Sequence, residues 1–313
     1  MVLIVAAGAA LVSAGCETAR GRDHGFAPVE RLGDDGFDAA GLAVHRGDAS
    51  GRVSFGGLAD ALSGADVVLV GEVHGHRRGL DFIATLFEEL ARRDDALVLS
   101  MEFYERDHQV ALDDYTGGLI DRAAFGDAAD RDAGNNPAGH QRMVEASRAM
   151  GRRVIASNAP RRYARMARTE GYGALGGLSA AQRAMFEIPD ALPEGAYAER
   201  FADAMGGMAG HGGDAMVRSF LRAQALWDAT MAGSVADAAG RGARVFHVAG
   251  HFHVDFAPRR GGSFMADLVR ERLGAGAAVR SVVVRRGAHA SLMPGDVGAA
   301  DFVVYAGAPA GGD

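Results

Sequence analysis

The sequence predicts an α/β fold in which a mainly parallel central sheet is covered by helices. Short apolar runs of strand length alternate along the chain with longer segments of helical periodicity. The runs are apolar throughout, which is typical of parallel strands with both faces buried. With 48% apolar and 23% charged residues, the 313-residue chain can also bury a sizeable core. Alternation of this kind favours strands joined by crossover helices.

Six apolar runs account for the predicted strands. They lie at residues 66–71, 96–101, 153–157, 244–249, 282–284 and 302–305. Helices are expected between them at residues 80–90, about 105–116, 141–150 and 160–169. In the first of these helices, apolar residues recur at the three- and four-residue spacing of one helix face. Pro160 opens the last of them, because proline is well suited to a helix start.

Residues 171–232 interrupt the alternation with a long stretch of helical or loop pattern. We interpret this stretch as a helical insertion, or lid, that packs over one edge of the sheet. A helix at 214–232 has a buried apolar stripe that includes Trp227. Gln224 lies within this stripe, and it is either a structural amide or a residue facing a pocket. The glycine-rich stretch 206–213 is either a hinge or a loop.

The N-terminus carries an uncharged apolar run that ends directly before Cys16. The run is too short for a membrane-spanning helix and is typical of a signal peptide. The residues around the cysteine resemble a bacterial lipobox. We therefore expect a signal peptide at 1–15, lipidation of Cys16, a flexible tether over 16–50 and the α/β domain at 51–313. A lipid anchor would attach the protein to a membrane of the cell envelope, on its periplasmic or outer-membrane side.

Composition excludes several classes of chemistry. The chain has no lysine, which rules out Schiff-base catalysis and a P-loop lysine. A single cysteine rules out an internal disulfide, a thiolate-ligated zinc or iron–sulfur centre and covalently attached c-type haem. A net charge of -7 disfavours a nucleic-acid partner.

Polar side chains gather where the first four major strands end. In an open parallel sheet the ligand site lies at the carboxyl ends of the strands. The candidate residues that follow these strands are Glu72 and His74, then Glu102 and Tyr104, then Asn158, Arg161 and Arg162, and finally His251 and His253. Four of the eleven histidines, His76 among them, thus fall in two short clusters, Glu72–His76 and His251–His253.

These residue types suit metal or acid–base chemistry. A neutral imidazole nitrogen can bind a metal, and a carboxylate can act as a ligand, as a general base or as a partner that orients the imidazole. Glu72 and His74 are two residues apart, so both point the same way on an extended backbone. His251 and His253 have the same spacing. We expect at least one member of each pair to line the functional site.

Five blocks of sequence, in order, resemble the ChaN-type haem-binding lipoproteins. This family belongs to the superfamily that includes TraB and Tiki proteins and erythromycin-esterase-like enzymes. The blocks are GEVH from Gly71, MEFYER from Met101, ASNAPRRY from Ala156, QALWDATMA from Gln224 and GHFHV from Gly250. The resemblance implies noncovalent haem binding, in pairs across a homodimer, as part of iron uptake. The matching positions are Glu72, His74, Glu102, Asn158, Arg161, Gln224 and His253. Many relatives carry tryptophan and tyrosine residues where this chain has the stretch 135–142, so His140 or Tyr104 would here replace a tyrosine that holds iron.

Two functions follow, and they use the same residues. In the first, the protein is a haem-binding envelope lipoprotein whose candidate partners are an outer-membrane haem receptor and an envelope transporter, and the sequence leaves open whether haem is stored, transferred or degraded. The candidate iron ligands are then His74, His253, His140 and Tyr104. Arg161 or Arg162 would pair with the propionates. In the second, a hydrolase uses Glu72 or Glu102 as general base, with His74 and His253 as ligands of zinc or another divalent metal, or as transition-state stabilisers. The sequence leaves open whether the protein is an enzyme.

Overall fold

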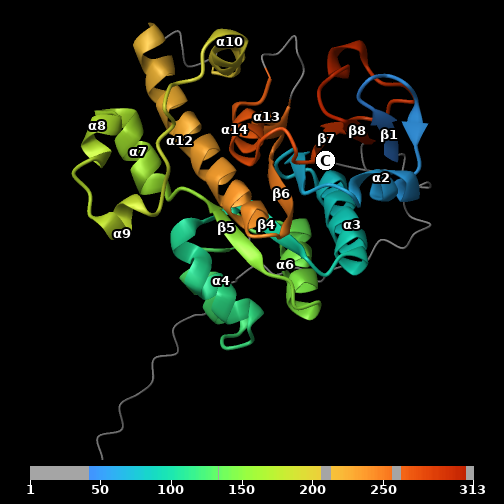
Figure 1. Ribbon diagram of the computed structural model, residues 1–313, viewed down its shortest axis with the longest axis horizontal. Coiled ribbons are helices and arrows are strands. Elements are labelled where there is room, and N and C mark those ends of the chain that lie inside the picture. The colour runs from blue at the N-terminus through green and yellow to red at the C-terminus, as the bar shows by residue number, and fades with distance from the viewer. Residues whose placement is uncertain (1–41, 133, 206–212, 256–261, 308–313) are drawn as a thin grey trace, which may run out of the picture.

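A single eight-stranded sheet forms the centre of the molecule (Figure 1). The computed structural model describes residues 42–132, 134–205, 213–255 and 262–307. The strand order is β2-β1-β8-β7-β3-β6-β4-β5, and the six strands from β8 to β5 run parallel. These six confirm the predicted runs, at β3 (Val67–Glu72), β4 (Leu97–Glu105), β5 (Val154–Asn158), β6 (Arg244–Gly250), β7 (Val279–Arg286) and β8 (Phe302–Ala306).

Two antiparallel strands at one edge were not anticipated. β1 (Leu42–Arg46) pairs with β8 along its whole length, and the short β2 (Arg52–Val53) pairs with β1. Leu42–Arg46, which we expected to belong to a flexible tether over 16–50, is therefore a strand of the sheet. Cys16 and the expected signal peptide at 1–15 lie outside the described residues.

Helices cover both faces of the sheet, because alternate residues of each strand point to opposite faces. Val68 and Val70 pack with α2 (Phe55–Leu62) and α3 (Arg77–Arg93) on one face. The same face carries α4 (Gln109–Thr116), α5 (Arg122–Ala128) and α6 (Ala138–Ala149). Val67 and Leu69 pack on the other face with α12 (Gly213–Gly240) and α14 (Phe264–Leu273). Burial of both faces explains why the strands are apolar throughout.

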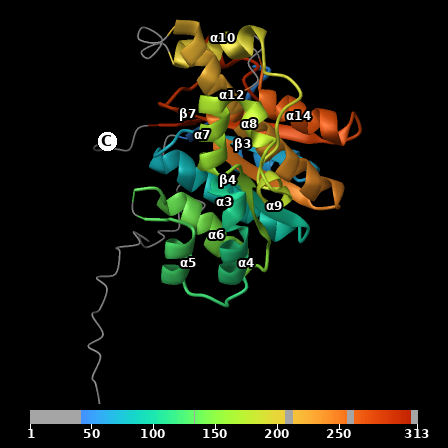
Figure 2. The ribbon, with the colours of Figure 1, turned by 90° about the vertical axis from the view of Figure 1, so that its left-hand side faces the viewer.

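The expected insertion at 171–232 has two parts: its last part belongs to a long helix that packs on the sheet, and its earlier part forms short helices beside that helix. α12 lies in the layer that covers the sheet, leads from the β5 side to β6 and continues to Gly240 rather than residue 232. Small buried residues on several sides of its last turns leave no single apolar stripe, so the sequence pattern did not show where the helix ends. Shorter helices flank it (Figures 1 and 2). They are α7 (Arg161–Glu170), α8 (Tyr172–Leu175), α9 (Ala180–Arg183) and α10 (Gly195–Ala204). The glycine-rich stretch 206–212 lies outside the described residues.

A side chain occupies the outer edge of β5, the last strand of the sheet. Nε2 of Gln109 donates to the carbonyl of Val154 at 2.9 Å, and the backbone N–H of Ala156 donates to Oε1 of Gln109 at 2.8 Å. The Gln109 amide thereby makes two hydrogen bonds that a neighbouring strand would otherwise make. Among the described residues, no helix has both the length and the apolar character needed to cross a membrane.

Candidate functional site

Two adjoining hollows lie at the carboxyl ends of β3, β4, β5 and β6, where the sequence predicted the site. The first hollow has a volume of about 540 Å³, and its apolar wall comes from Phe201, Met205, Trp227 and Phe252. The second hollow, of about 440 Å³, has a more polar wall that includes His108, Arg131, Asn135, Asn158 and Arg161. Glu72, His74, Glu102 and Trp227 line both hollows and form the boundary between them. Volumes of this size fit small-molecule sites.

Glu72 ends β3 and is buried, with 1% of its side chain exposed. Nδ1 of His74 lies 2.9 Å from its Oε1, and Nε2 of His140 lies 2.5 Å from its Oε2. Burial alone would raise the pKa of Glu72, but His140 and His74 outweigh it and lower that pKa below its ordinary value. The buried carboxylate is therefore ionised and holds one nitrogen of each imidazole.

His74 is well placed to offer its other nitrogen to a ligand. Its side chain is 65% exposed, and its ring packs edge-on against Phe103. A Cβ on Gly250 would lie 2.9 Å from Nε2 of His74, so the glycine leaves the room that this ring occupies. The hydrogen bond with Glu72 is the main cause that raises the pKa of His74.

Glu102 forms the second carboxylate of the site. Its Oε2 accepts a hydrogen bond from the backbone N–H of Gly250 at 2.6 Å, and its Oε1 lies 3.5 Å from Nε2 of His253. Burial raises the pKa of Glu102, but the charge of His253 and these hydrogen bonds outweigh it and bring the pKa to about 2. Glu102 is therefore also ionised.

His253 is held between two carboxylates, because its Nδ1 hydrogen-bonds to Asp228 on α12. Burial lowers the pKa of His253, yet Glu102 and Asp228 outweigh burial and raise it to about 10. The hydroxyl of Tyr197 on α10 donates to the other oxygen of Asp228 at 2.5 Å, and the Gln224 amide lies 3.3 Å from both ring nitrogens of His253. His253 is thus an imidazolium with both nitrogens engaged, a geometry that does not favour the expected metal-ligand role.

His251 opens α13 (His251–Val254) and lines the first hollow. Burial is the main cause that lowers its pKa to about 4, so the ring is neutral at pH 7. Its Nδ1 is buried and has no hydrogen-bond partner. The two histidines of this block therefore differ in charge although they are only two residues apart.

Two predicted site residues are placed away from the hollows. Tyr104 is buried in the core beside Phe125 and does not line either hollow. The register of the β4–β5 pairing shifts between Met101 and Glu105, which breaks the alternation of the strand and turns Tyr104 toward the core. Burial also raises its pKa to about 12, so an iron ligand at Tyr104 is not supported.

Arg162 is the second residue placed elsewhere. Its guanidinium lies 2.5 Å from Asp107 and over the ring of Tyr163. Its neighbour Arg161 does line the second hollow, where its Nε lies 3.5 Å from Glu105. The predicted propionate pair is therefore reduced to Arg161, because consecutive helical residues point in different directions. Asn158 lines the same hollow, and its Oδ1 accepts the N–H of Ala159 at 2.8 Å.

His140, expected as a substitute ligand, acts on Glu72 instead. Its ring is buried and lies over Phe103, with 3.8 Å between the ring centroids. Its Nε2 is taken by Glu72, so that nitrogen is not free for iron.

Several residues of the site escaped sequence reasoning. Asp228 lies four residues after Gln224, and this helical spacing was a signal that could have found it. Tyr197 and Arg131 had no such signal, because they reach the site from separate segments.

Glu105, Asp107 and His108 also lie close enough together to hold a metal, but Arg161 and Arg162 already face the two carboxylates.

Comparisons with known proteins give a matching family model and a similar fold. The model of a family described as haem-binding uptake, Tiki superfamily, ChaN, matches residues 58–261. The fold is similar to that of ChaN of Campylobacter jejuni, whose structure is described as showing cofacial heme binding. That similarity has a TM-score of 0.64 and 14% identity, and covers 84% of this chain and 96% of the other.

Weaker similarities are found to other solved structures. A Bacillus cereus protein has a TM-score of 0.46 at 9% identity, over 88% of this chain and 96% of its own. An erythromycin esterase has a TM-score of 0.44 at 14% identity, over 78% and 77%. No curated protein was found to be similar to this chain.

Proposed function

This chain belongs to the haem-binding uptake family of the Tiki superfamily that includes ChaN, and we propose that it binds haem noncovalently where its two hollows meet. The proposal places the tetrapyrrole beside His74, against the apolar wall of the first hollow. Phe201, Met205 and Phe252 contribute that wall, and such side chains suit a flat hydrophobic ligand. Bound haem would supply an iron that accepts a nitrogen ligand.

The hydrogen bond between His74 and Glu72 carries the proposal. A metal-ligating histidine almost always donates its other ring N–H to a carboxylate or carbonyl, which fixes the ring and makes the ligating nitrogen more basic. Nδ1 of His74 has this partner in Glu72 at 2.9 Å, and the ring is largely exposed at the boundary of both hollows. His74 is therefore the proposed iron ligand, and Glu72 its orienting partner.

A haem titration tests this function. Adding haem to the purified protein should produce a Soret band, and His74→Ala should abolish or strongly shift it. His289→Ala is the matched control, because His289 packs against Tyr305 outside both hollows. The proposal fails if micromolar haem leaves the absorption spectrum of the wild-type protein unchanged.

The cellular setting is part of the same proposal. We place the protein in the cell envelope, held by lipid on Cys16, where it takes part in haem or iron uptake with a receptor or transporter. The cofacial heme binding described for the Campylobacter jejuni protein supports a homodimer that pairs two haems. Incorporation of labelled fatty acid that is lost in Cys16→Ala would support the anchor. Light scattering with and without haem would report the dimer.

A hydrolase is the second candidate, and the network of Asp228, His253 and Glu102 favours it. Buried acidic and basic side chains linked in a chain are costly, and such arrangements are common where protons are transferred. Because His253 has both nitrogens engaged, this version uses Glu102 and His253 for acid–base chemistry without a metal on His253. Esterase and peptidase assays combined with elemental analysis test it. Turnover that is lost in Glu102→Gln would support it, and chelator-sensitive turnover with stoichiometric zinc would favour the metal-dependent form.

A further inference from the structure

Arg131 is a buried cation at the wall of the second hollow. It follows α5 in the segment that leads to α6, and only 8% of the residue is exposed. Its Nη1 donates to the carbonyl of Asn135 at 3.1 Å, and its guanidinium lies 4.6 Å from the ring centroid of Tyr104. Its Nε is buried and has no hydrogen-bond partner.

No ion pair joins Arg131 to a carboxylate of the described residues. Other sheltered arginines of this protein do have such partners. Arg142 makes two hydrogen bonds to Glu88, at 2.7 and 2.9 Å, and Arg285 is paired with two aspartates. Buried charges in proteins are normally paired, because removing a charge from water is costly. Burial accordingly lowers the pKa of Arg131, because the charged guanidinium loses solvation without gaining a fixed counter-ion.

The carboxylates that line the second hollow with Arg131 are already engaged or exposed. Glu72 and Glu102 line the same hollow but are held by histidines. Glu105 faces Arg161, and Asp130 is exposed. The second hollow therefore contains a sheltered guanidinium whose planar fork matches a carboxylate.

We propose that Arg131 binds a carboxylate of the ligand in the second hollow, with Arg161 as a second cation at its wall. The inference rests on the proposed function, since the propionates of haem are carboxylates of this kind. It assigns the anionic end of the ligand to the second hollow and the apolar body to the first. The ligand class is thus a planar hydrophobic molecule with one or more carboxylate arms.

A comparison of haem with its dimethyl ester tests the assignment, because the ester keeps the ring and iron but lacks the charged carboxylates. Dissociation constants for both are measured by Soret titration of wild-type protein, Arg131→Gln and Arg162→Gln. We expect wild type to prefer free haem, and Arg131→Gln to weaken free haem by about 10- to 100-fold while leaving the ester nearly unchanged. Arg162→Gln, which removes a guanidinium outside the hollow, should keep the wild-type preference.

The assignment would be overturned if Arg131→Gln bound free haem as tightly as wild type does, or if it lost affinity equally for free haem and for the ester. Unaltered ester binding shows that the variant is folded, and Arg131→Lys, which keeps the charge without the fork, should retain part of the preference. If wild type binds neither ligand, the proposed haem function fails. The carboxylate site at Arg131 is then tested by itself, from the melting temperature of the protein with and without succinate. Succinate should raise the melting temperature of wild type but not of Arg131→Gln, and an equal effect on both would overturn the assignment.

Discussion

Nε2 of His140 lies 2.5 Å from Oε2 of Glu72, while the His140 ring lies over Phe103, tilted by 32°, at a centroid distance of 3.8 Å. The ring contact and the hydrogen bond together fix the carboxylate that holds His74. His140 thus positions the proposed iron ligand through a second residue.

Replacing His140 separates its hydrogen bond from its packing. His140→Phe keeps an aromatic ring but no donor, so Glu72 should hold His74 less firmly and haem affinity should fall by about 10- to 100-fold. His140→Gln can still donate and should lose less. Haem dissociation constants and the Soret position check this, and identical spectra and affinities for His140→Phe and wild type would limit His140 to core packing.

Tyr197→Phe should destabilise the fold by about 1–3 kcal/mol, because the buried Asp228 loses a donor. Tyr172→Phe is the matched control, since its hydroxyl donates to the neutral carbonyl of Arg222 at 2.8 Å. It should cost about 1 kcal/mol. Urea unfolding at pH 7 measures both, and an equal loss in the two variants would argue against a special role for the Asp228 contact.

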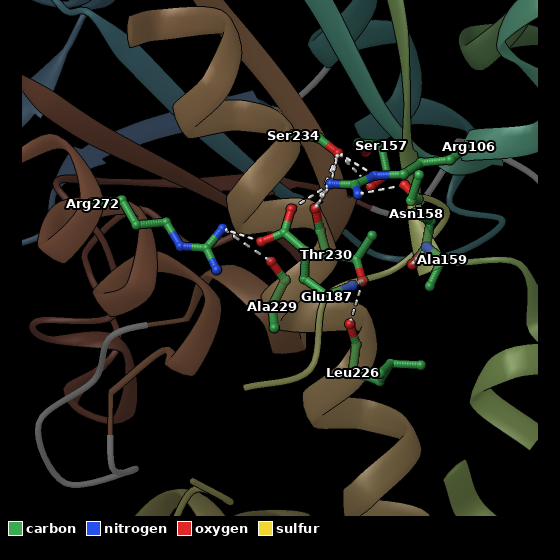
Figure 3. A network of polar contacts seen from close by, with 11 residues as sticks. Arg106, Ser157, Asn158, Ala159, Glu187, Leu226, Ala229, Thr230, Ser234 and Arg272 are labelled. Carbon is green, nitrogen blue, oxygen red and sulfur yellow. Dashed lines mark hydrogen bonds and ion pairs between the residues drawn. The ribbon is translucent and has the colours of Figure 1, made fainter. Parts of the chain in front are cut away.

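Gly233→Ala should destabilise the protein although alanine is the better helix former. The new Cβ would lie 1.8 Å from Oε1 of Glu187. Arg106 binds this oxygen at 2.7 Å, and Arg272 binds Oε2 of the same carboxylate at 2.6 Å (Figure 3). Moving Glu187 would break this clamp, and the loss should exceed the gain of about 1 kcal/mol in helix propensity.

Gly240→Ala is the control for that substitution, because a Cβ there meets nothing within 4 Å. Thermal and urea unfolding should rank Gly233→Ala below both wild type and Gly240→Ala. A Gly233→Ala protein as stable as Gly240→Ala would show that Glu187 moves without cost.

Acid should destabilise the protein through His247. Burial is the main cause that lowers the pKa of this histidine from 6.5 to about 3, and Oγ of Ser100 lies 2.9 Å from its Nδ1. Between these two values the unfolded chain binds a proton that the folded chain does not. Stability is therefore unaffected above about pH 6.5 and falls as the pH drops toward 3, by up to roughly 5 kcal/mol.

His247→Asn removes this titration and should flatten the fall in unfolding free energy between pH 7 and pH 5. Urea titrations of wild type and variant at the two pH values measure the difference. Parallel losses in both proteins would assign acid sensitivity to other groups.

The sequence predicted the parallel strands and the rim where most candidate residues come together, because both depend on local patterns. Uniformly apolar runs identify buried strands, and strand ends identify the rim where Glu72, His74, Glu102 and His253 meet. The β1–β2 edge was missed because its few residues carry a mixed polar pattern and depend on pairing with the distant β8.

The roles within the site were harder to predict than its position. Tyr104 lies in the core rather than at the rim because the β4–β5 register shifts, and the spacing of residues in the sequence does not reveal such a shift. The different charges of His251 and His253 arise from partners on other segments, chiefly Asp228 and Glu102 for His253. Arg131 could not be recognised because its significance lies in the partner that it lacks.

The amide of Gln109 on the outer side of β5 also restricts how two copies can meet. At the other end of the described sheet stands β2, which is only two residues long. Neither described border offers a long free strand to a second molecule, so continuous intermolecular sheets of the kind seen in aggregates are disfavoured. A homodimer would then associate through helix surfaces or pocket rims, which would leave the openings of two sites able to face each other.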